Sequence, residues 1–337
     1  MAGSDAMNRY ARQTCLPEVG DVGQAALAAA HVLVVGVGGL GAPVLQYLVG
    51  AGVGRLTLVD GDTVAMSNLH RQTLFREADI GEPKVSAAAK TLRALNRDCR
   101  IEPLVQSLDP ANAPGLVGQS CLVLDCADSF ATSYILSDAC RAAGIPLISA
   151  SALGLAGYVG GFCGTAPSLR AVFPDLPDRA ATCATAGVMG PVVGMIGAAQ
   201  AQMALASLLG QSPSPLGQLI RFDMQSFRTS GFRFDTAPDP QPDLMFIAPG
   251  AIAAPDFVVE LRDTGEAPAP VCAHARRLSV AEFAERKPRP AGDQRAVMVC
   301  RSGLRAWQAA TTLRTYWDGE ISLIAMGDTP SNEGSTK

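Results

Sequence analysis

The sequence is poor in charged residues and has no paired cysteine motif. Only 17% of its 337 residues are charged and the formal net charge is -4, so nothing favours binding to nucleic acid. Nine cysteines are scattered along the chain, and none stands in a C-x-x-C pair. An odd set of cysteines in a chain without a secretory hydrophobic region predicts a reduced, cytoplasmic protein.

Long apolar runs are also missing near the start of the chain. The longest one there, Ala25–Val35, is interrupted by His31 and is too short to span a bilayer, so we expect no membrane association. Hydrophobic residues make up 48% of the chain, which is ample for a buried core. The length favours two domains, or one large domain with an appendage.

A glycine-rich turn between two apolar strands is the most informative local feature. The run Val32–Val35 enters the sequence G-V-G-G-L-G, a small-residue helix follows, and a second apolar strand ends on Asp60. In a βαβ unit of this kind Gly36 permits a tight turn, Gly38 lets a phosphate approach, and Gly41 lets helix and strand pack closely. Asp60 stands where a carboxylate binds ribose hydroxyls. The pattern favours a nucleotide site over a glycine-rich packing turn.

The loop after the second strand is dense in polar groups that could reach the phosphates. Its candidates are Asp62, Ser67, Asn68, Arg71 and Gln72. Beyond it, Lys84 falls in the first turn of a helix expected at 83–97. A cation there opposes the helix dipole unless an anion lies nearby, which favours a bound polyphosphate over a solvent-facing lysine.

Strand and helix patterns alternate from residue 31 to residue 151. We expect strands at 31–35, 55–60, 101–106, 121–126 and 146–151, and helices at 42–51, 83–97, 110–117 and 129–143. This alternation predicts an α/β fold with a doubly wound, mainly parallel sheet. Later strands are expected within 154–164 and 219–234, plausibly antiparallel, and a helix at 188–209.

Two carboxylates lie at the end of the fourth expected strand, where doubly wound sheets bind ligands. Either Asp125 or Asp128 could hold Mg²⁺ beside phosphates, or cap the helix that follows. Asp128 is the better metal candidate because it lies beyond the strand.

Several motifs occur together in one order along the chain. They are R-Y-A-R-Q at 9–13, G-V-G-G-L-G at 36–41, D-x-D-T-V-x-x-S-N-L-x-R-Q at 60–72, G-E-P-K at 81–84, L-D-C-A-D at 124–128 and T-C-A-T-A-G-V-M-G-P at 182–191. Over residues 8–235 the chain resembles the ThiF/MoeB/HesA family, relatives of ubiquitin-activating enzymes with a Rossmann-like fold. The resemblance implies that Mg-ATP is used to adenylate the C-terminal Gly-Gly of a small ubiquitin-like sulfur-carrier protein.

The resemblance also implies roles for single positions. Gly39 lies against the nucleotide, Asp60 binds the ribose, Asn68, Arg71 and Lys84 contact the triphosphate, and Asp128 positions Mg²⁺ and ATP. Ser129 replaces the usual asparagine. In the family homodimers, the arginine matching Arg12 reaches the partner's phosphates, although the arm alone is also typical of a solvated surface segment. The expected ATP-binding residues are therefore Arg12, Gly36, Gly38, Gly39, Gly41, Asp60, Asp62, Ser67, Asn68, Arg71, Gln72, Lys84, Asp128 and Ser129.

The chemistry implied by the resemblance suits these residue types. A carboxylate that attacks the α-phosphorus is already ionised and needs no general base, while Arg71, Lys84, Mg²⁺ and Arg12 can offset the developing charge. Cys183 matches a family cysteine proposed to take part in acyl or persulfide transfer, and the alternative is a buried structural thiol.

Relatives often carry two C-x-x-C pairs that bind structural zinc. The first would fall within Pro167–Pro174, where serine and alanine stand instead, and Phe234–Phe246 contains no cysteine. A tetrahedral Cys₄ site needs thiolates, so we predict no zinc.

The C-terminal part is expected to be a second, smaller α/β domain at 256–330. It follows a linker at 237–255, and we expect the adenylyltransferase domain at 8–236, with disordered ends at 1–7 and 331–337. C-R-S-G-L-R at 300–305 resembles the active-site loop of rhodanese-like domains, whose cysteine carries a persulfide. Backbone N–H groups and arginines near Cys300 favour its thiolate. His274 is expected to be a surface residue.

Together these features favour an adenylyltransferase joined to a sulfurtransferase, serving thiamine or molybdopterin cofactor biosynthesis. Cys300 would take sulfur from an upstream donor such as a cysteine desulfurase. An NAD(P)-dependent oxidoreductase on the same βαβ unit is one alternative. A non-catalytic adaptor that docks a ubiquitin-like tail is the other.

Overall fold

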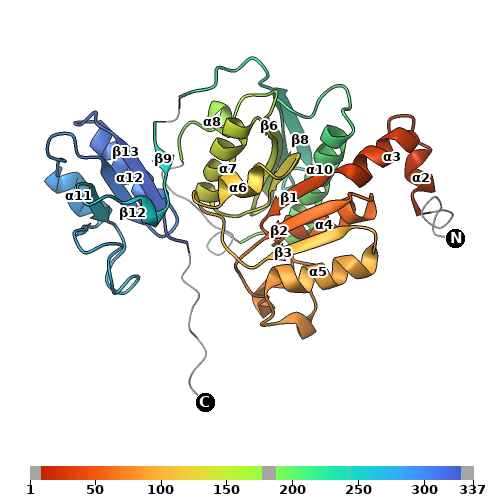
Figure 1. The fold of residues 1–337 in the computed structure, drawn as a ribbon, viewed down its shortest axis with the longest axis horizontal. Helices are drawn as coiled ribbons and strands as arrows, with labels where there is room; N and C mark the ends of the chain where they lie inside the picture. The colour runs from red at the N-terminus through yellow and green to blue at the C-terminus, as the bar shows by residue number, and fades with distance from the viewer. Residues whose placement is uncertain (1–8, 177–186, 242, 328–337) are drawn as a thin grey trace.

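A computed structural model describes residues 9–176, 187–241 and 243–327, and it contains one large and one small sheet (Figure 1). The large sheet has eight strands in the order β3-β2-β1-β4-β5-β6-β7-β8. Their bounds are β1 (His31–Val35), β2 (Arg55–Val59), β3 (Arg100–Leu104), β4 (Leu122–Asp125), β5 (Pro146–Leu153), β6 (Ala156–Cys163), β7 (Gln218–Asp223) and β8 (Arg228–Arg233).

The first five strands of the large sheet pair in parallel, and β6, β7 and β8 extend it in antiparallel fashion. Both features confirm the predicted doubly wound α/β fold. The order reverses between β1 and β4, and ligands of open α/β sheets bind at such a switch point. Side chains of β1 alternate between two cores, Val32 and Val34 on one face and Leu33 and Val35 on the other, because a strand has a period of two.

Helices cover both faces of this sheet (Figure 1). They are α4 (Gly41–Gly50), α5 (Lys84–Leu95), α6 (Ala113–Val117), α7 (Phe130–Ala143), α8 (Leu169–Val172) and α10 (Gly190–Leu208), with short 3-10 turns η1 (Met66–Asn68) and η2 (Glu77–Asp79). By length and composition alone α10 could span a membrane, but it packs against α4, β5 and β6 as a core helix. Helix α6 begins three residues later than predicted, because Asp109 first accepts the N–H groups of Ala111 and Asn112 in a turn.

The N-terminal arm consists of α2 (Ala11–Thr14) and α3 (Gly20–Ala29). Gln13 and Gln24 both donate hydrogen bonds to the carbonyl of Ala51, and Tyr10 accepts one from Asn96. Ala51 follows the C-terminal end of α4, so the arm is docked at the edge where the parallel strands begin. Figure 1 shows it on the side of the large domain away from the small sheet.

The small sheet is entirely parallel, in the order β11-β10-β12-β13-β9. Its elements are β9 (Met245–Phe246), η3 (Pro249–Ala251), β10 (Phe257–Glu260), β11 (Arg276–Arg277), α11 (Val280–Arg286), β12 (Ala296–Cys300), α12 (Leu304–Arg314) and β13 (Ile321–Ala325). Strand β9 lies inside the range predicted as a linker. Apolar residues on one face of the small sheet join those of α6 and α7 in one core cluster, and those on the other face form a cluster of their own.

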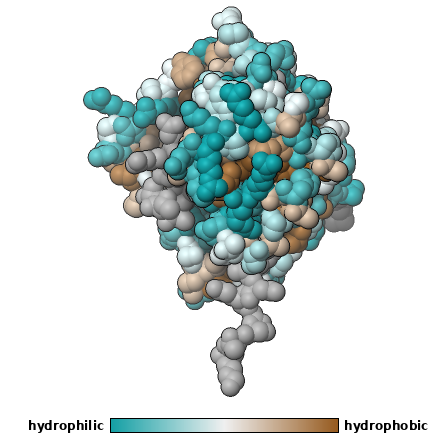
Figure 2. All heavy atoms as spheres, turned by 90° about the vertical axis from the view of Figure 1, so that its left-hand side faces the viewer, coloured by the Kyte–Doolittle hydropathy of each residue, from teal (hydrophilic) through white to brown (hydrophobic). Residues whose placement is uncertain are grey.

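The free end of the small unit carries mostly hydrophilic side chains around a narrow apolar strip (Figure 2). Helix α11 and the residues next to it contribute exposed charges of both signs, among them Glu285, Arg286, Lys287 and Arg289.

Candidate functional site

The glycine loop lies at the carboxyl ends of β1 and β4. Gly36 has φ +91°, and a Cβ there would lie 2.6 Å from the carbonyl oxygen of Cys126. A Cβ at Gly41 would lie 2.3 Å from the carbonyl oxygen of Gly36. A Cβ at Gly38 would meet only the amide nitrogen of Gln72, at 3.5 Å. Gly36 and Gly41 are therefore required by packing, as predicted, whereas Gly38 leaves an open approach to the backbone.

Asp60 links the glycine loop to the loop after β2. Its carboxylate accepts hydrogen bonds from the backbone N–H groups of Val37 and Asp62, each at 2.8 Å. Burial raises the pKa of this carboxyl, while the nearby Lys84 and the two N–H groups oppose the rise. Asp60 thus lies at the carboxyl end of β2 and connects the glycine loop to the loop after β2, at the position predicted for ribose binding.

Lys84 is brought beside the glycine loop by a short antiparallel contact between residues 62–64 and 81–84. Its N–H bonds to the carbonyl of Asp62, and Thr63 pairs with Pro83. The Lys84 side chain is only 8% exposed, and its Nζ lies 2.7 Å from Oδ2 of Asp62. The solvent-facing alternative is wrong, and the anion that the structure places near this helix start is the Asp62 carboxylate.

The segment 65–72 folds over the glycine loop as a self-capped turn. Asn68 accepts the N–H of Ala65 through its side-chain oxygen, and Arg71 donates from Nη1 to the carbonyl of the exposed Ser67. Arg71 also lies against Gly39, where a Cβ would be 3.6 Å from Arg71 Cγ and 2.8 Å from Val193.

Gln72 has an unsatisfied polar atom in this turn. Its side chain is 3% exposed and faces Gly38, yet no described residue donates to its Oε1. The atom that faces Gly38 is the other end of the amide, Nε2, a donor that a polar ligand there could accept from.

The end of β4 separates the two candidate aspartates. Asp125 is fully buried, accepts hydrogen bonds from Ser149 Oγ at 2.7 Å and from Ala127 N–H at 3.2 Å, and burial raises its pKa to about 6. Asp128 is exposed, and Ser129 is the N-cap residue of α7. Among the described residues no side chain caps the N-terminus of α7 at Ser129. Asp128 is therefore not used as a helix cap, and its carboxylate is the free one of the two aspartates.

Gln200 is a site residue that the sequence reasoning missed. From α10 its fully buried amide donates to the carbonyls of Asp125 at 2.7 Å and of Ile148 at 3.0 Å, and it accepts from the thiol of Cys126. One side chain therefore ties α10 to the adjacent strands β4 and β5 close to Asp128. Sequence alone gave only a weak signal, because the same helix also carries the exposed Gln202.

One predicted residue, Arg12, is not brought to this edge in its own chain. Arg12 is exposed on α2, on the arm docked at the opposite edge of the sheet. Cys183 lies outside the described residues, as do the predicted ends 1–7 and 331–337.

The sequence matches the ThiF family over residues 10–243. The chain belongs to the ThiF family. It is similar to adenylyltransferase and sulfurtransferase MOCS3 of Bos taurus, with 49% identity over 220 residues, or 64% of this chain and 48% of that protein. It is 38% identical to SAMP-activating enzyme E1 of Haloferax volcanii over 235 residues, 69% of this chain and 87% of that one. The chain thus spans about half the length of the MOCS3 proteins it matches.

Solved structures of two other proteins share the fold of this ThiF-family chain. PaaA aligns with a TM-score of 0.60 and 25% identity, covering 69% of this chain and 74% of that one. MccB of E. coli aligns with a TM-score of 0.62 and 20% identity, covering 70% and 74%.

The candidate sulfur site of this ThiF-family chain lies beyond the family match, at the end of β12. Cys300 Sγ accepts hydrogen bonds from the N–H groups of Gly303 at 3.1 Å and Ala306 at 3.3 Å. The predicted donation by backbone N–H groups is therefore present. The thiol is fully buried, however, and burial raises its pKa more than the N–H groups and Arg305 lower it. The expectation of a favoured thiolate is wrong for this closed arrangement.

The loop around Cys300 is fixed by arginines. Arg305 donates to the carbonyl of Leu261 and pairs with Glu266, and Arg262 makes a buried bidentate pair with Glu260. His274 is exposed, as predicted.

Proposed function

We propose that this chain adenylates the C-terminal carboxylate of a ubiquitin-like sulfur carrier ending in Gly-Gly, and then delivers sulfur to it from Cys300. The observation that carries the first step is the ring of contacts at one sheet edge. A Cβ at Gly38 would meet only the Gln72 amide, Asp60 and Arg71 contact the loop that contains Gly38, and Lys84 pairs with Asp62. The name of the bovine relative includes both activities, and the name of the archaeal relative, an activating enzyme, supports the first.

The residues fit Mg-ATP by the chemistry of their side chains. Asp60 lies where it would hold ribose, while Arg71 and Lys84 supply the cations that a triphosphate requires. No group of three or more His, Cys, Asp or Glu residues gathers in the described part of the chain. Mg²⁺ is usually held by one or two carboxylates plus phosphates and waters, so Asp128 suffices as its protein ligand. When bound, Mg²⁺ would neutralise phosphate charge.

The reaction needs positioning and charge compensation from this chain rather than a base. The carrier's carboxylate attacks the α-phosphorus, and pyrophosphate leaves. Arg71 and Lys84 stabilise the charge that develops on the phosphate oxygens. Asp62 holds the side chain of the buried Lys84 in place through their ion pair.

We further propose a homodimer in which Arg12 acts on the partner's phosphates. The docking of α2 at the opposite sheet edge supports this, because it holds Arg12 away from the site of its own chain. Mixed dimers of Arg12→Ala and Lys84→Met subunits should regain activity, since one site per dimer then has both residues. Mixing that gives no more activity than either variant alone would argue against the exchange of Arg12.

Sulfur would enter as a persulfide on Cys300, supplied by an upstream donor such as a cysteine desulfurase, and Cys183 is a candidate intermediate. Both halves suit a cytoplasmic enzyme that makes a thiocarboxylate for thiamine or molybdopterin synthesis.

The first experiment measures carrier-dependent exchange of labelled pyrophosphate into ATP with a panel of purified ubiquitin-like proteins that end in Gly-Gly. Exchange should persist in Cys300→Ala while mass spectrometry shows that thiocarboxylate is lost. An adaptor would bind a carrier without exchange, so the absence of exchange with every carrier would refute the proposal.

A further inference from the structure

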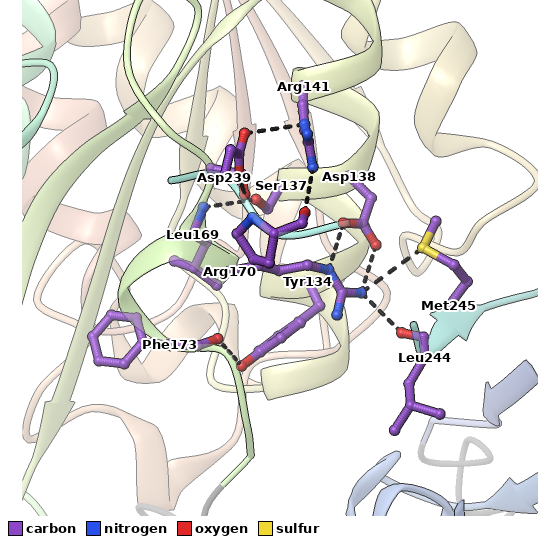
Figure 3. Close-up of polar contacts among 12 residues, drawn as sticks. Tyr134, Ser137, Asp138, Arg141, Leu169, Arg170, Phe173, Asp239, Leu244 and Met245 are labelled. Atoms are coloured by element: carbon purple, nitrogen blue, oxygen red, sulfur yellow. Dashed lines mark hydrogen bonds and ion pairs between the residues drawn. The ribbon is translucent and has the colours of Figure 1, made fainter. Parts of the chain in front are cut away.

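A buried arginine joins the large domain to the small unit. Arg170 of α8 is 3% exposed, and it donates from Nε and Nη2 to the two carboxylate oxygens of Asp138 in α7, each at 2.8 Å. Its Nη2 also donates to the carbonyl of Leu244, the residue before β9 (Figure 3). The guanidinium lies over the rings of Tyr134 at 4.8 Å and Trp307 at 5.9 Å. One side chain thus contacts α7, the residue that precedes β9, and α12.

A second polar tie holds the same connection one helical turn away. Arg141 of α7 pairs with Asp239 at 3.0 Å and donates to the carbonyl of Pro240, and Ser168 also donates to Asp239 (Figure 3). Because both ties join α7 or α8 to residues 239–244, the connection between the two units is fixed along the surface of α7. Lysine could replace neither arginine fully, since it lacks a planar fork.

This junction places the Cys300 loop against the start of α7. Trp307 of α12 packs edge-on against Tyr134, with centroids 5.4 Å apart. A Cβ at Gly303 would lie 3.1 Å from the Cβ of Ala131, the second residue of α7. The exposed Asp128 stands three residues before Ala131, at the sheet edge described above. The sulfur loop and the candidate adenylation edge therefore meet at one helix start of the same chain.

We propose that Arg170 is a positioning residue that holds Cys300 in place to deliver sulfur to the adenylate formed in its own subunit. This inference rests on the proposed function. The Cys300 thiol is fully buried when the small unit is held against α7. Its loop must therefore open to accept sulfur from a donor, and renewed contact through Arg170 returns the sulfur to the start of α7.

The sulfur steps balance as follows with thiosulfate as donor and a dithiol as reductant. The Cys300 thiolate takes the sulfane sulfur and releases sulfite, which leaves a persulfide. The terminal sulfur bonds to the acyl carbon, the bond from that carbon to the phosphate oxygen breaks, and AMP leaves with the electron pair. The dithiol then reduces the acyl disulfide, freeing the carrier thiocarboxylate and the Cys300 thiol.

Arg170→Met tests the positioning role through three separate measurements. Pyrophosphate exchange reports on the large domain, sulfite release from thiosulfate reports on the small unit, and thiocarboxylate formation requires both. We expect exchange to stay within about twofold, loading to be kept or raised, and thiocarboxylate formation to fall about tenfold or more. Arg286→Met, which removes an exposed arginine paired within α11, is the matched control and should change none of them.

The Trp307→Leu variant extends this test, because it removes the ring that Arg170 contacts. If both residues act through one junction, the double variant should transfer sulfur no more slowly than the less active of the two single variants. A loss of thiocarboxylate no larger than the loss of exchange, or of loading, would mean that Arg170 is only structural.

Mixed dimers of differently tagged Asp128→Asn and Cys300→Ala subunits test delivery within one subunit. In such a dimer the chain that adenylates has no Cys300, so thiocarboxylate should not exceed the sum of the two variants measured separately. Thiocarboxylate restored alongside normal exchange would overturn this inference and leave the proposed function standing. Absence of exchange in the wild-type chain would overturn the proposed function, and this inference with it.

Discussion

Two glycines at the ends of one helix should respond in opposite ways to the same substitution. Gly41 begins α4 and Gly50 ends it. A Cβ at position 41 would lie 2.3 Å from a backbone oxygen, so the turn or the helix must move, whereas nothing lies within 4 Å of a Cβ at position 50. Overpacking costs about 1–3 kcal/mol, and removing a glycine from a helix gains about 0.5–1 kcal/mol.

The expected difference between the two variants is therefore about 1.5–4 kcal/mol in the free energy of unfolding. At roughly 3 °C per kcal/mol for a domain of this size, Gly41→Ala should lower the melting temperature by about 3–9 °C and Gly50→Ala should raise it by about 2–3 °C. Differential scanning calorimetry measures both, with urea unfolding as a second assay.

Gly38→Ala completes the set, because its Cβ would meet only Gln72 at an ordinary contact distance. We expect its stability to stay within about 1 kcal/mol of the wild type. ATP affinity by calorimetric titration should fall for Gly38→Ala and Gly41→Ala but not for Gly50→Ala. The reasoning would be refuted if Gly41→Ala were as stable as the wild type, or if Gly38→Ala bound ATP normally.

Three further predictions concern charged groups. Lys84→Met should reduce pyrophosphate exchange about 100-fold. Urea unfolding should show a loss of stability of at most about 1 kcal/mol, because the Asp62 side chain is 69% exposed and is solvated when left alone. A large loss of stability would contradict this prediction. Burial raises the pKa of Asp125 to about 6, so the folded chain holds a proton that the unfolded chain loses above about pH 4, and stability falls as the pH rises through this range. Asp125→Asn should remove that fall, and its stability relative to the wild type should gain about 2 kcal/mol between pH 4 and pH 7 in urea unfolding at stepped pH, whereas parallel curves would count against it. Arg305 lowers the pKa of Cys300 against the effect of burial, so Arg305→Met should move the pH profile of sulfite release to higher pH, and an unchanged profile would exclude this charge as a cause.

Local sequence patterns were sufficient for most of the large sheet. Apolar runs such as Val32–Val35 and the glycines at 36 and 41 are dictated by burial and by backbone contacts within a few residues. The same reasoning identified strands β6 to β8, whose antiparallel pairing the structure confirms. It also identified the polar loop that folds over Gly38 and Gly39.

Pairings between distant segments were beyond such reasoning. Lys84 needs an anion because of its place in the helix, but only the contact of 62–64 with 81–84 shows that Asp62 provides one. Gln200 and Arg170 bind carbonyl groups 52 and 74 residues away. The direction of the net shift in the pKa of Cys300 could not be predicted either, because burial depends on packing that the motif itself does not encode.

Strand β9 has a practical consequence for dividing the chain. It supplies one edge of the small sheet by pairing with β13, and the N–H of Ile247 continues the ladder to the carbonyl of Leu323. A fragment that begins at residue 256, after the proline-rich stretch, would leave β13 as an open edge able to pair with other molecules. A fragment that begins before Leu244 keeps this edge covered, but it still lacks α7 and α8, against which Trp307 packs, so only a piece that includes these helices keeps both surfaces covered.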